Sequence, residues 1–315
     1  MDRTMAGLLA AIRAQPWAIL PEYLEAIEAL ALRAMQADVL EFLAKDGHQA
    51  RLAETRGAVA ATGTPLQGAE MSTVRNGVAV VPVLGPVFPR ANLIGSSSGG
   101  TGLDAVMRDF RVALASPDVE RVVMLFDSPG GVVSGLGEAA DAIHGAAKPV
   151  TSFVTGMGAS AAYWLASQAG QIVLDRAASV GSIGVVASTS RQEAIGADGR
   201  RSYEVVSSNA PNKRPDLSTE EGRAALQAEV DAIEAVFIAD VARGRKVSAG
   251  MVRADFGRGG MLPAAAAVAA GMADRIGTLD SVLQTTGRAR TTPPVSRRAL
   301  AEAQIETRRR SADRR

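Results

Sequence analysis

The sequence predicts an α/β fold, because β-rich apolar runs alternate with amphipathic helical patterns through the middle of the chain. Residues 78–84 form a Val-rich run of strand length, and residues 103–115 repeat apolar side chains every three or four positions, as a helix does. The alternation continues with strands at 121–126, 150–154, 171–174 and 203–206, and with helices at 135–147, 160–168 and 219–243. Such alternation is typical of sheets covered by helices.

A helical extension is expected ahead of this main domain. Pro21 fits a first helical turn, and apolar side chains then recur at helical spacing as far as Leu43. Residues 55–68 are rich in Gly, Pro and small polar side chains, which predicts a linker. We therefore expect a helical extension and linker at 1–70, a main domain at 71–285 and a basic, disordered tail at 286–315.

The composition of residues 89–102 predicts a flexible loop, which is either a lid over the substrate or an ordinary surface loop.

Composition excludes several classes of site. The 315 residues include no cysteine, so disulfides, thiolate metal sites and a cysteine nucleophile are ruled out, and no pattern indicates a metal or cofactor. No signal peptide is evident, and apolar runs are shorter than the roughly 20 residues that span a bilayer. We therefore expect a soluble, cytoplasmic protein.

Charge is unevenly distributed along the chain. The net charge is +1, but nine Arg against three acidic residues give the segment from Gly287 to Arg315 a balance of +6, which leaves −5 for the rest. Such a tail is either a solvated end or a contact for nucleic acid or an acidic partner.

Ser160 is the candidate nucleophile. It stands in the run Gly156-Met157-Gly158-Ala159-Ser160-Ala161-Ala162, whose small side chains leave the hydroxyl accessible at the start of a predicted helix. A serine hydroxyl needs a nearby base, and donors for the oxyanion that forms during acyl transfer. Free N–H groups at the beginning of a helix can serve as such donors. The same run also suits a helix that packs closely and has no catalytic role.

A glycine turn, Ser128-Pro129-Gly130-Gly131, follows the strand at 121–126. The carboxyl ends of strands are where α/β sheets bind ligands. Paired glycines let a substrate carbonyl approach an exposed N–H, so Gly131 is the candidate oxyanion donor. Pro-Gly-Gly is also a common turn and does not establish a site by itself.

Lysine fits the role of the base better than histidine. His48 and His144 are the only histidines, and neither lies in a motif, which disfavours a Ser-His-Asp triad. A lysine is a base only when neutral, and bringing its pKa from about 10.4 to near 7 requires deep burial. Lys213 lies in the irregular segment after 203–206, and its context leaves it undecided between surface lysine and base. The other lysines have surface-type surroundings: Lys45, Lys148 and Lys246.

These segments resemble, in order and spacing, the signal peptide peptidase A family of serine peptidases, peptidase family S49, which includes phage head-maturation proteases. The resemblance extends over 78–283 and includes two further motifs, Val180-Gly181-Ser182-Ile183-Gly184-Val185 and Gly271-Met272-Ala273-Asp274-Arg275-Ile276-Gly277. It implies a Clp/crotonase-type fold of repeated ββα units and no cofactor. It implies Ser160 as nucleophile, Lys213 as general base and Ser182 as the residue that hydrogen-bonds the lysine. The N–H groups of Gly131 and Ala161 would form the oxyanion hole.

Two features bear on the subtype. Many members carry Ser-Gly shortly before the lysine. This chain departs from that pattern, which bears on the register of Lys213, because it reads Ser207-Ser208-Asn209-Ala210-Pro211-Asn212-Lys213. Cellular members typically carry a membrane anchor, whereas the helix from Pro21 resembles the leader of prophage capsid-assembly proteases. The resemblance then implies scaffold, portal or capsid precursors as substrates, bound as extended strands. It also implies a homo-oligomeric ring in which Lys213 acts in its own subunit or on a neighbour's Ser160.

Other functions remain open at this point. One is a cellular signal-peptide-degrading peptidase without an anchor, and another is a catalytically silent assembly protein, which would be expected to lack Ser160 or Lys213. A Clp-type peptidase would need a histidine where Ser182-Ile183-Gly184 stands. A crotonase-type hydratase would need acidic residues at the site.

Overall fold

The computed structural model describes residues 12, 15–34, 62–90, 100–187, 206–210 and 213–284. The chain divides into two compact units, Met1–Leu283 and Gln284–Arg315. Several sequence predictions lie outside the described residues: the helix beyond Ala34, most of the strand at 203–206, the centre of the 89–102 loop, and the basic tail. Within the described ranges, no helix has both the length and the apolarity needed to cross a membrane.

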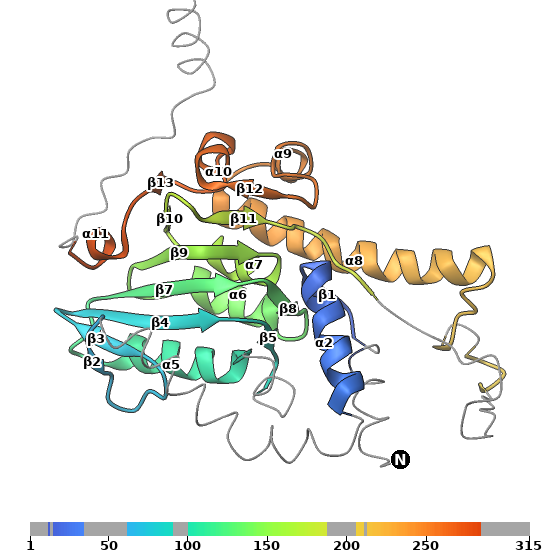
Figure 1. The fold of residues 1–315 in the computed structure, drawn as a ribbon, viewed down its shortest axis with the longest axis horizontal. Helices are drawn as coiled ribbons and strands as arrows, with labels where there is room; N and C mark the ends of the chain where they lie inside the picture. Colours follow the sequence, from blue (N-terminus) through green and yellow to red (C-terminus); the bar gives the residue numbers. More distant parts are fainter. Residues whose placement is uncertain are drawn as a thin grey trace, which may run out of the picture. The chain divides into compact units, whose positions relative to one another are not determined.

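A mixed nine-stranded sheet forms the centre of the first unit (Figure 1). The order along its main path is β12-β11-β9-β7-β4-β3-β2, while β10 pairs with both β9 and β13. The central strands β4, β7, β9 and β11 are parallel neighbours, so their carboxyl ends meet at one edge. The bounds are β2 Thr64–Pro65, β3 Thr73–Arg75, β4 Val78–Leu84, β7 Arg121–Ser128, β9 Val150–Ala159, β10 Gln171–Leu174, β11 Ser179–Gly181, β12 Met261–Pro263 and β13 Arg275–Ile276.

A smaller sheet of four short strands lies at that edge, in the order β1-β8-β5-β6. Its strands are β1 Trp17–Ile19, β5 Val87–Phe88, β6 Thr101–Gly102 and β8 Gly130–Val132. Each of β4 and β7 is followed by short strands of this second sheet and then by a helix. The ββα unit therefore occurs twice, which confirms the Clp/crotonase-type arrangement that the family resemblance implied.

Helices cover both faces of the main sheet. Alternate residues of β4 point to opposite faces, as the pleat of a strand requires. Val81 and Val83 join the core that α5, α6, α7 and part of α8 cover, whereas Val80 packs with Val282 of α11. The bounds are α2 Pro21–Ala34, α5 Leu103–Ala115, α6 Leu136–His144, α7 Ala161–Ala166, α8 Glu220–Arg245, α9 Ala249–Asp255, α10 Ala264–Ala270 and α11 Leu279–Gln284.

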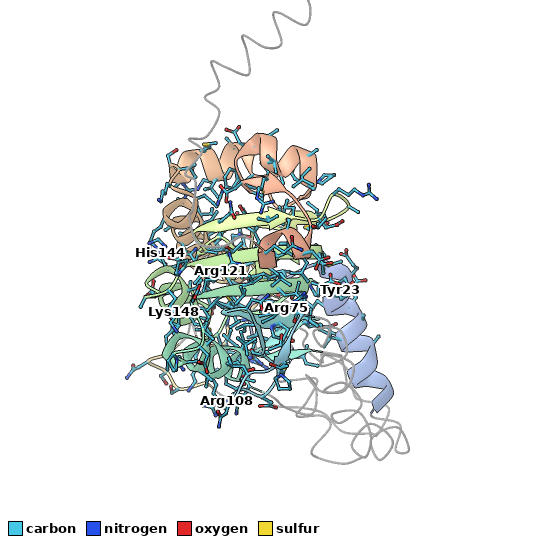
Figure 2. All side chains as sticks on the ribbon, turned by 90° about the vertical axis from the view of Figure 1, so that its left-hand side faces the viewer. Tyr23, Arg75, Arg108, Arg121, His144 and Lys148 are labelled. Carbon is cyan, nitrogen blue, oxygen red and sulfur yellow. The ribbon has the colours of Figure 1, made fainter. Side chains whose placement is uncertain are left out.

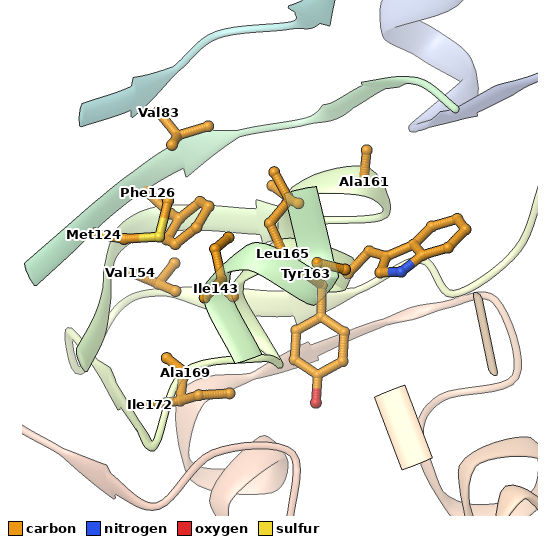
Figure 3. Close-up of a cluster of buried hydrophobic side chains, with 14 of the residues drawn as sticks. Val83, Met124, Phe126, Ile143, Val154, Ala161, Tyr163, Leu165, Ala169 and Ile172 are labelled. Carbon is orange, nitrogen blue, oxygen red and sulfur yellow. The ribbon is translucent and has the colours of Figure 1, made fainter. Parts of the chain in front are cut away.

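The short helix α7 lies inside the main core, and all six of its residues are buried. Figure 3 shows Leu165 beside Ile143 of α6 and near Phe126 of β7. The Tyr163 hydroxyl donates to the Met272 carbonyl at 2.9 Å, and burial raises the pKa of Tyr163 above its ordinary value. A six-residue helix is too short to be stable by itself, so tertiary packing holds it.

Long-range contacts tie the C-terminal half of α8 to this core. Trp164 stacks on Phe237 with ring centroids 4.4 Å apart, and its indole N–H donates to Asp240 at 2.8 Å. Arg245 holds Asp274 with two hydrogen bonds of 2.9 and 3.1 Å, and Asp274 also accepts from the Ile172 N–H at 2.7 Å. The motif at 271–277 therefore joins α8 to β10, which is a structural role.

The predicted elements agree closely with the observed ones where apolar patterns are strong. β4, α5 and β10 have the predicted bounds, and α8 begins one residue later than predicted. β9 is longer than predicted and runs to Ala159, so the glycines before Ser160 belong to a strand. Part of the expected linker forms β2, which pairs with β3. The strand β1 was not predicted.

Candidate active site

Ser160 occupies the sharp turn between β9 and α7. Its φ is +53° and its ψ is −116°, a backbone conformation that residues with a side chain rarely adopt. The Ser160 N–H donates to the Gly181 carbonyl at 2.7 Å, and its carbonyl accepts from Trp164 at 2.9 Å, so both sides of the turn are fixed. Strain of this kind, held by its surroundings, is frequent at functional sites.

The glycine turn lies directly against Ser160. Gly130 has φ +104°, and a Cβ on it would stand 3.0 Å from the Ser160 Cβ. A Cβ on Gly131 would stand 1.9 Å from the Val87 carbonyl oxygen of β5, so no side chain fits there. The Gly130 N–H donates to the Ser128 hydroxyl at 3.2 Å, which fixes the turn. Segments some 30 residues apart in sequence are thus brought together at one sheet edge.

Ser182 lies beside Ser160 because of strand register. β11 runs parallel to β9 with Gly181 opposite Ala159, and each serine is the next residue after its strand. Ser182 also has φ +53°, and its N–H donates to the Gly260 carbonyl at 3.0 Å. Both serines are buried, and the Ser160 hydroxyl contacts the Gly184 carbonyl at 3.5 Å. Ser160, Ser182 and the glycine turn therefore form one cluster.

His144 and Lys148 lie at the opposite end of β9. Both precede its first residue, Val150, while Ser160 follows its last, and ten residues of strand extend about 30 Å. Lys148 donates to the carbonyls of Ala113 and Ser116 at 3.1 and 2.6 Å, at the end of α5. Both side chains are labelled in Figure 2, which views the molecule from the left of Figure 1. Neither can reach Ser160.

Lys246 is excluded by a similar argument. It follows Arg245, which binds Asp274, and Asp274 contacts Ile172 of β10. Ile172 is paired with Ser152, near the start of β9. Lys246 therefore also belongs to the far end of the sheet. His48 and Lys45 lie outside the described residues.

Lys213 is exposed. It sits in a short turn seven residues before α8, and its N–H donates to the Ala210 carbonyl at 3.1 Å. The buried residues of α8 are Gly222 and four residues from Phe237 onward, so the first half of the helix is largely solvent-exposed. Figure 1 shows this half running beyond the sheet. Among the described contacts, none joins Lys213 to Ser160.

The strand β1 is the part of the site that sequence reasoning missed. It pairs antiparallel with β8, and Ala18 stands opposite Gly131. The available signal was weak, a run of only four apolar residues between Gln15-Pro16 and Pro21. In the described ranges there is no group of three His, Asp or Glu side chains that could hold a metal ion.

Comparison with known proteins finds a similarity to one peptidase family. The model of peptidase family S49 matches residues 142–291, a range that contains Ser160, Ser182 and Lys213. The matched region begins after the glycine turn, which lies upstream at 128–131.

Relatives of this chain include phage proteins. Capsid assembly protease C of Escherichia phage lambda is 36% identical over 36% of this chain and 26% of its own length. The head-tail preconnector protein GP5 of Enterobacteria phage P21 is 31% identical over 60% of this chain and 38% of its own. The chain thus spans less than two fifths of the length of these relatives.

Solved structures with a similar fold come from two kinds of protein. An enoyl-CoA hydratase from Shewanella pealeana has a TM-score of 0.42 and 12% identity, and covers 70% of this chain and 72% of its own. A membrane-bound stomatin-specific protease in complex with a substrate peptide has a TM-score of 0.40 and 15% identity, over 66% of this chain and 79% of its own.

Proposed function

We propose that this chain is a serine endopeptidase of the S49 type with Ser160 as its nucleophile. The observation that carries the proposal is the strained turn that holds Ser160 against Gly130 and beside Ser182. In acyl transfer, the Ser160 hydroxyl attacks a peptide carbonyl carbon, and the N–H groups of Gly131 and Ala161 stabilise the oxyanion. The amine leaves with a proton, and water then releases the acyl group.

Lys213 is the proposed general base, with Ser182 as its hydrogen-bonding partner. A lysine base must be neutral, and burial away from carboxylates favours the neutral form. Lys213 is exposed in the single chain, in a turn seven residues before the largely exposed first half of α8. We therefore propose that Lys213 becomes buried against Ser160 of a second copy. A homo-oligomeric ring would thus complete each site.

The proposed substrates are proteins of phage capsid assembly, such as scaffold, portal or capsid precursors, cleaved in the cytoplasm of the bacterial host. The two phage relatives support this class. The family resemblance keeps signal-peptide degradation as the second candidate. Protease 4 of Salmonella typhi, a bacterial relative, is 34% identical over 28% of this chain and 15% of its own length. A silent assembly protein is disfavoured because Ser160 and Lys213 are both present.

A fluorophosphonate probe tests the nucleophile. We expect the parent to be labelled, Ser160→Ala not to be labelled, and Ser152→Ala to be labelled like the parent. Ser152 is a matched control because it is also buried, on β9, the strand that ends just before Ser160, where it donates to the Ala166 carbonyl at 3.1 Å. Equal labelling of Ser160→Ala and the parent would refute the nucleophile.

Substrate class is tested by mixing the parent or Ser160→Ala with the capsid, portal and scaffold proteins encoded beside it, and separately with synthetic signal peptides. Fragments of the assembly proteins that require Ser160 are the expected result. Cleavage of the signal peptides alone would favour the second candidate.

A further inference from the structure

The strand β1 is bound along both of its edges. On one edge it pairs antiparallel with β8, with Trp17 opposite Val132 and Ala18 opposite Gly131. On the other edge, Trp17 and Val186 exchange two backbone hydrogen bonds of 2.8 Å each. An extended segment hydrogen-bonded to exposed strand edges is the usual form of a peptide bound by strand addition.

The register places the Ala18 carbonyl at the proposed oxyanion donor. The Val133 N–H donates to the Pro16 carbonyl at 3.4 Å, and the Leu20 N–H donates to the Pro129 carbonyl at 3.0 Å. Hydrogen-bonded pairs alternate along an antiparallel ladder, so the pair between these two, Ala18 and Gly131, is also hydrogen-bonded. The Gly131 N–H therefore faces the Ala18 carbonyl oxygen.

The nucleophile lies at the same point. A Cβ on Gly130 would stand 2.2 Å from the Ala18 carbonyl oxygen, 3.0 Å from the Ile19 Cα and 3.0 Å from the Ser160 Cβ. The peptide bond between Ala18 and Ile19 therefore runs past Ser160, where a scissile bond would lie. The chain's own N-terminal strand fills the position of a substrate.

We propose that Trp17–Ile19 is an internal occupant of the substrate groove, which must leave before a protein substrate can bind. The proposal rests on the proposed function, because that function makes this groove a substrate site. While β1 is in place, the Gly131 N–H and both strand edges are already used. The folded chain is then a latent form that is opened by displacement of β1.

The side chains of β1 explain how the occupant is held. Trp17 and Ile19 pack with Leu24 and Ile27 of α2 in a small cluster of their own, and Trp17 meets Phe88 edge-to-face at 5.9 Å. Ala18 points the other way, into the main core, and is fully buried. A segment tethered to its site acts at an effective concentration in the millimolar range, so a free substrate competes poorly. Only a small side chain fits at position 18.

Peptide binding in the Ser160→Ala background tests the proposal without any need for catalysis. Ala18→Arg should expel β1, because a large charged side chain cannot occupy a fully buried site. We expect a fluorescent peptide of residues 14–22 to bind at least 10-fold more tightly to the Ala18→Arg protein, measured by fluorescence anisotropy. The same peptide carrying Arg at position 18 should not bind.

Ala26→Arg is the matched control, since Ala26 lies exposed on α2 and the substitution is identical. It should leave peptide binding as in the background protein. If Ala18→Arg fails to melt cooperatively, Trp17→Ala takes its place, because it loosens the strand without inserting a charge. Here too, at least 10-fold tighter binding is expected.

Two results would overturn the proposal that β1 occupies the substrate groove. One is unchanged peptide binding in folded Ala18→Arg and Trp17→Ala proteins. The other is a cut between Ala18 and Ile19 that depends on Ser160, detected by intact-mass measurement, since β1 would then be a substrate. The same two substitutions are also made in protein that retains Ser160. If probe labelling at Ser160 is then present but no faster than in the parent, the proposal that β1 occupies the groove is refuted while the peptidase assignment is kept. If labelling is absent even though peptide binding has improved, the assignment of Ser160 as a peptidase nucleophile is refuted, while the proposal that β1 occupies the groove is kept.

Discussion

At the scale of single residues, the site depends on positions where only a small group fits. Gly131 is enclosed by Val87 of β5, and Gly130 has a positive φ and touches both Ser160 and β1. Ser160 itself is held at a φ of +53° by backbone hydrogen bonds on both sides. The turn therefore fixes the hydroxyl before any substrate arrives, which is the preorganisation that nucleophilic catalysis requires.

Gly131→Ala should lower the free energy of unfolding by more than about 2 kcal/mol, because its Cβ would stand 1.9 Å from the Val87 oxygen. Urea denaturation measures the change. The contrasting variant is Gly137→Ala, since a Cβ there meets nothing within 4 Å and Ala is preferred to Gly in a helix by about 0.5–1 kcal/mol. Similar stability of the two variants would show that the β5–β8 contact is not tight.

At the scale of elements, buried polar groups fix segments that have little apolar surface. The Asp109 carboxylate on α5 is fully buried and accepts from the backbone N–H groups of Glu70, Met71 and Ser72 at 2.8, 2.8 and 3.0 Å. It accepts from the Ser72 hydroxyl as well. This one side chain holds the segment that leads into β3, and β3 in turn protects the edge of β4.

Asp109→Ala should destabilise the domain by about 3–5 kcal/mol, because it leaves buried donors without an acceptor. Asp118→Ala, at an exposed position close by, should change stability by less than about 0.5 kcal/mol. Urea denaturation of both proteins checks the difference. A loss below about 1 kcal/mol for Asp109→Ala would mean that water replaces the carboxylate.

At the scale of the whole molecule, the proposed nucleophile and the proposed base do not meet within the described part of one chain. Three of the proposed groups, Ser160, Ser182 and Gly131, meet at the carboxyl edge of the parallel strands. Lys213 precedes the exposed half of α8 and has no contact to them in the described residues. Assembly is therefore the proposed step that completes the site.

Complementation tests that step. Ser160→Ala and Lys213→Ala should each be inactive on a peptide substrate, while the two proteins refolded together should regain activity, since mixed oligomers contain interfaces with one intact Ser160 and one intact Lys213. Turnover of a fluorogenic peptide is the measurement. Mixed oligomers that form, as judged by size, yet remain inactive would place Lys213 in the same chain as its Ser160.

The sequence by itself determined most of the secondary structure and indicated the residues of the proposed site. Apolar periodicity is a local property, so β4, α5, β10 and α8 could be placed from it closely. Residue type and motif order indicated Ser160, Gly131 and Ser182, and strand register brings them to one edge. The S49 match to 142–291 supports the family that these motifs suggested.

Only the tertiary structure decided which groups meet. β1 is too short to carry a periodic signal, and its partners Gly131 and Val186 are more than 100 residues away in sequence. The exposure of Lys213 and the distance from Ser160 to Lys148 likewise follow from where α8 and β9 run, which no local pattern encodes. Hydrogen bonding along strand edges, rather than residue identity, places the chain's own Ala18 at the nucleophile.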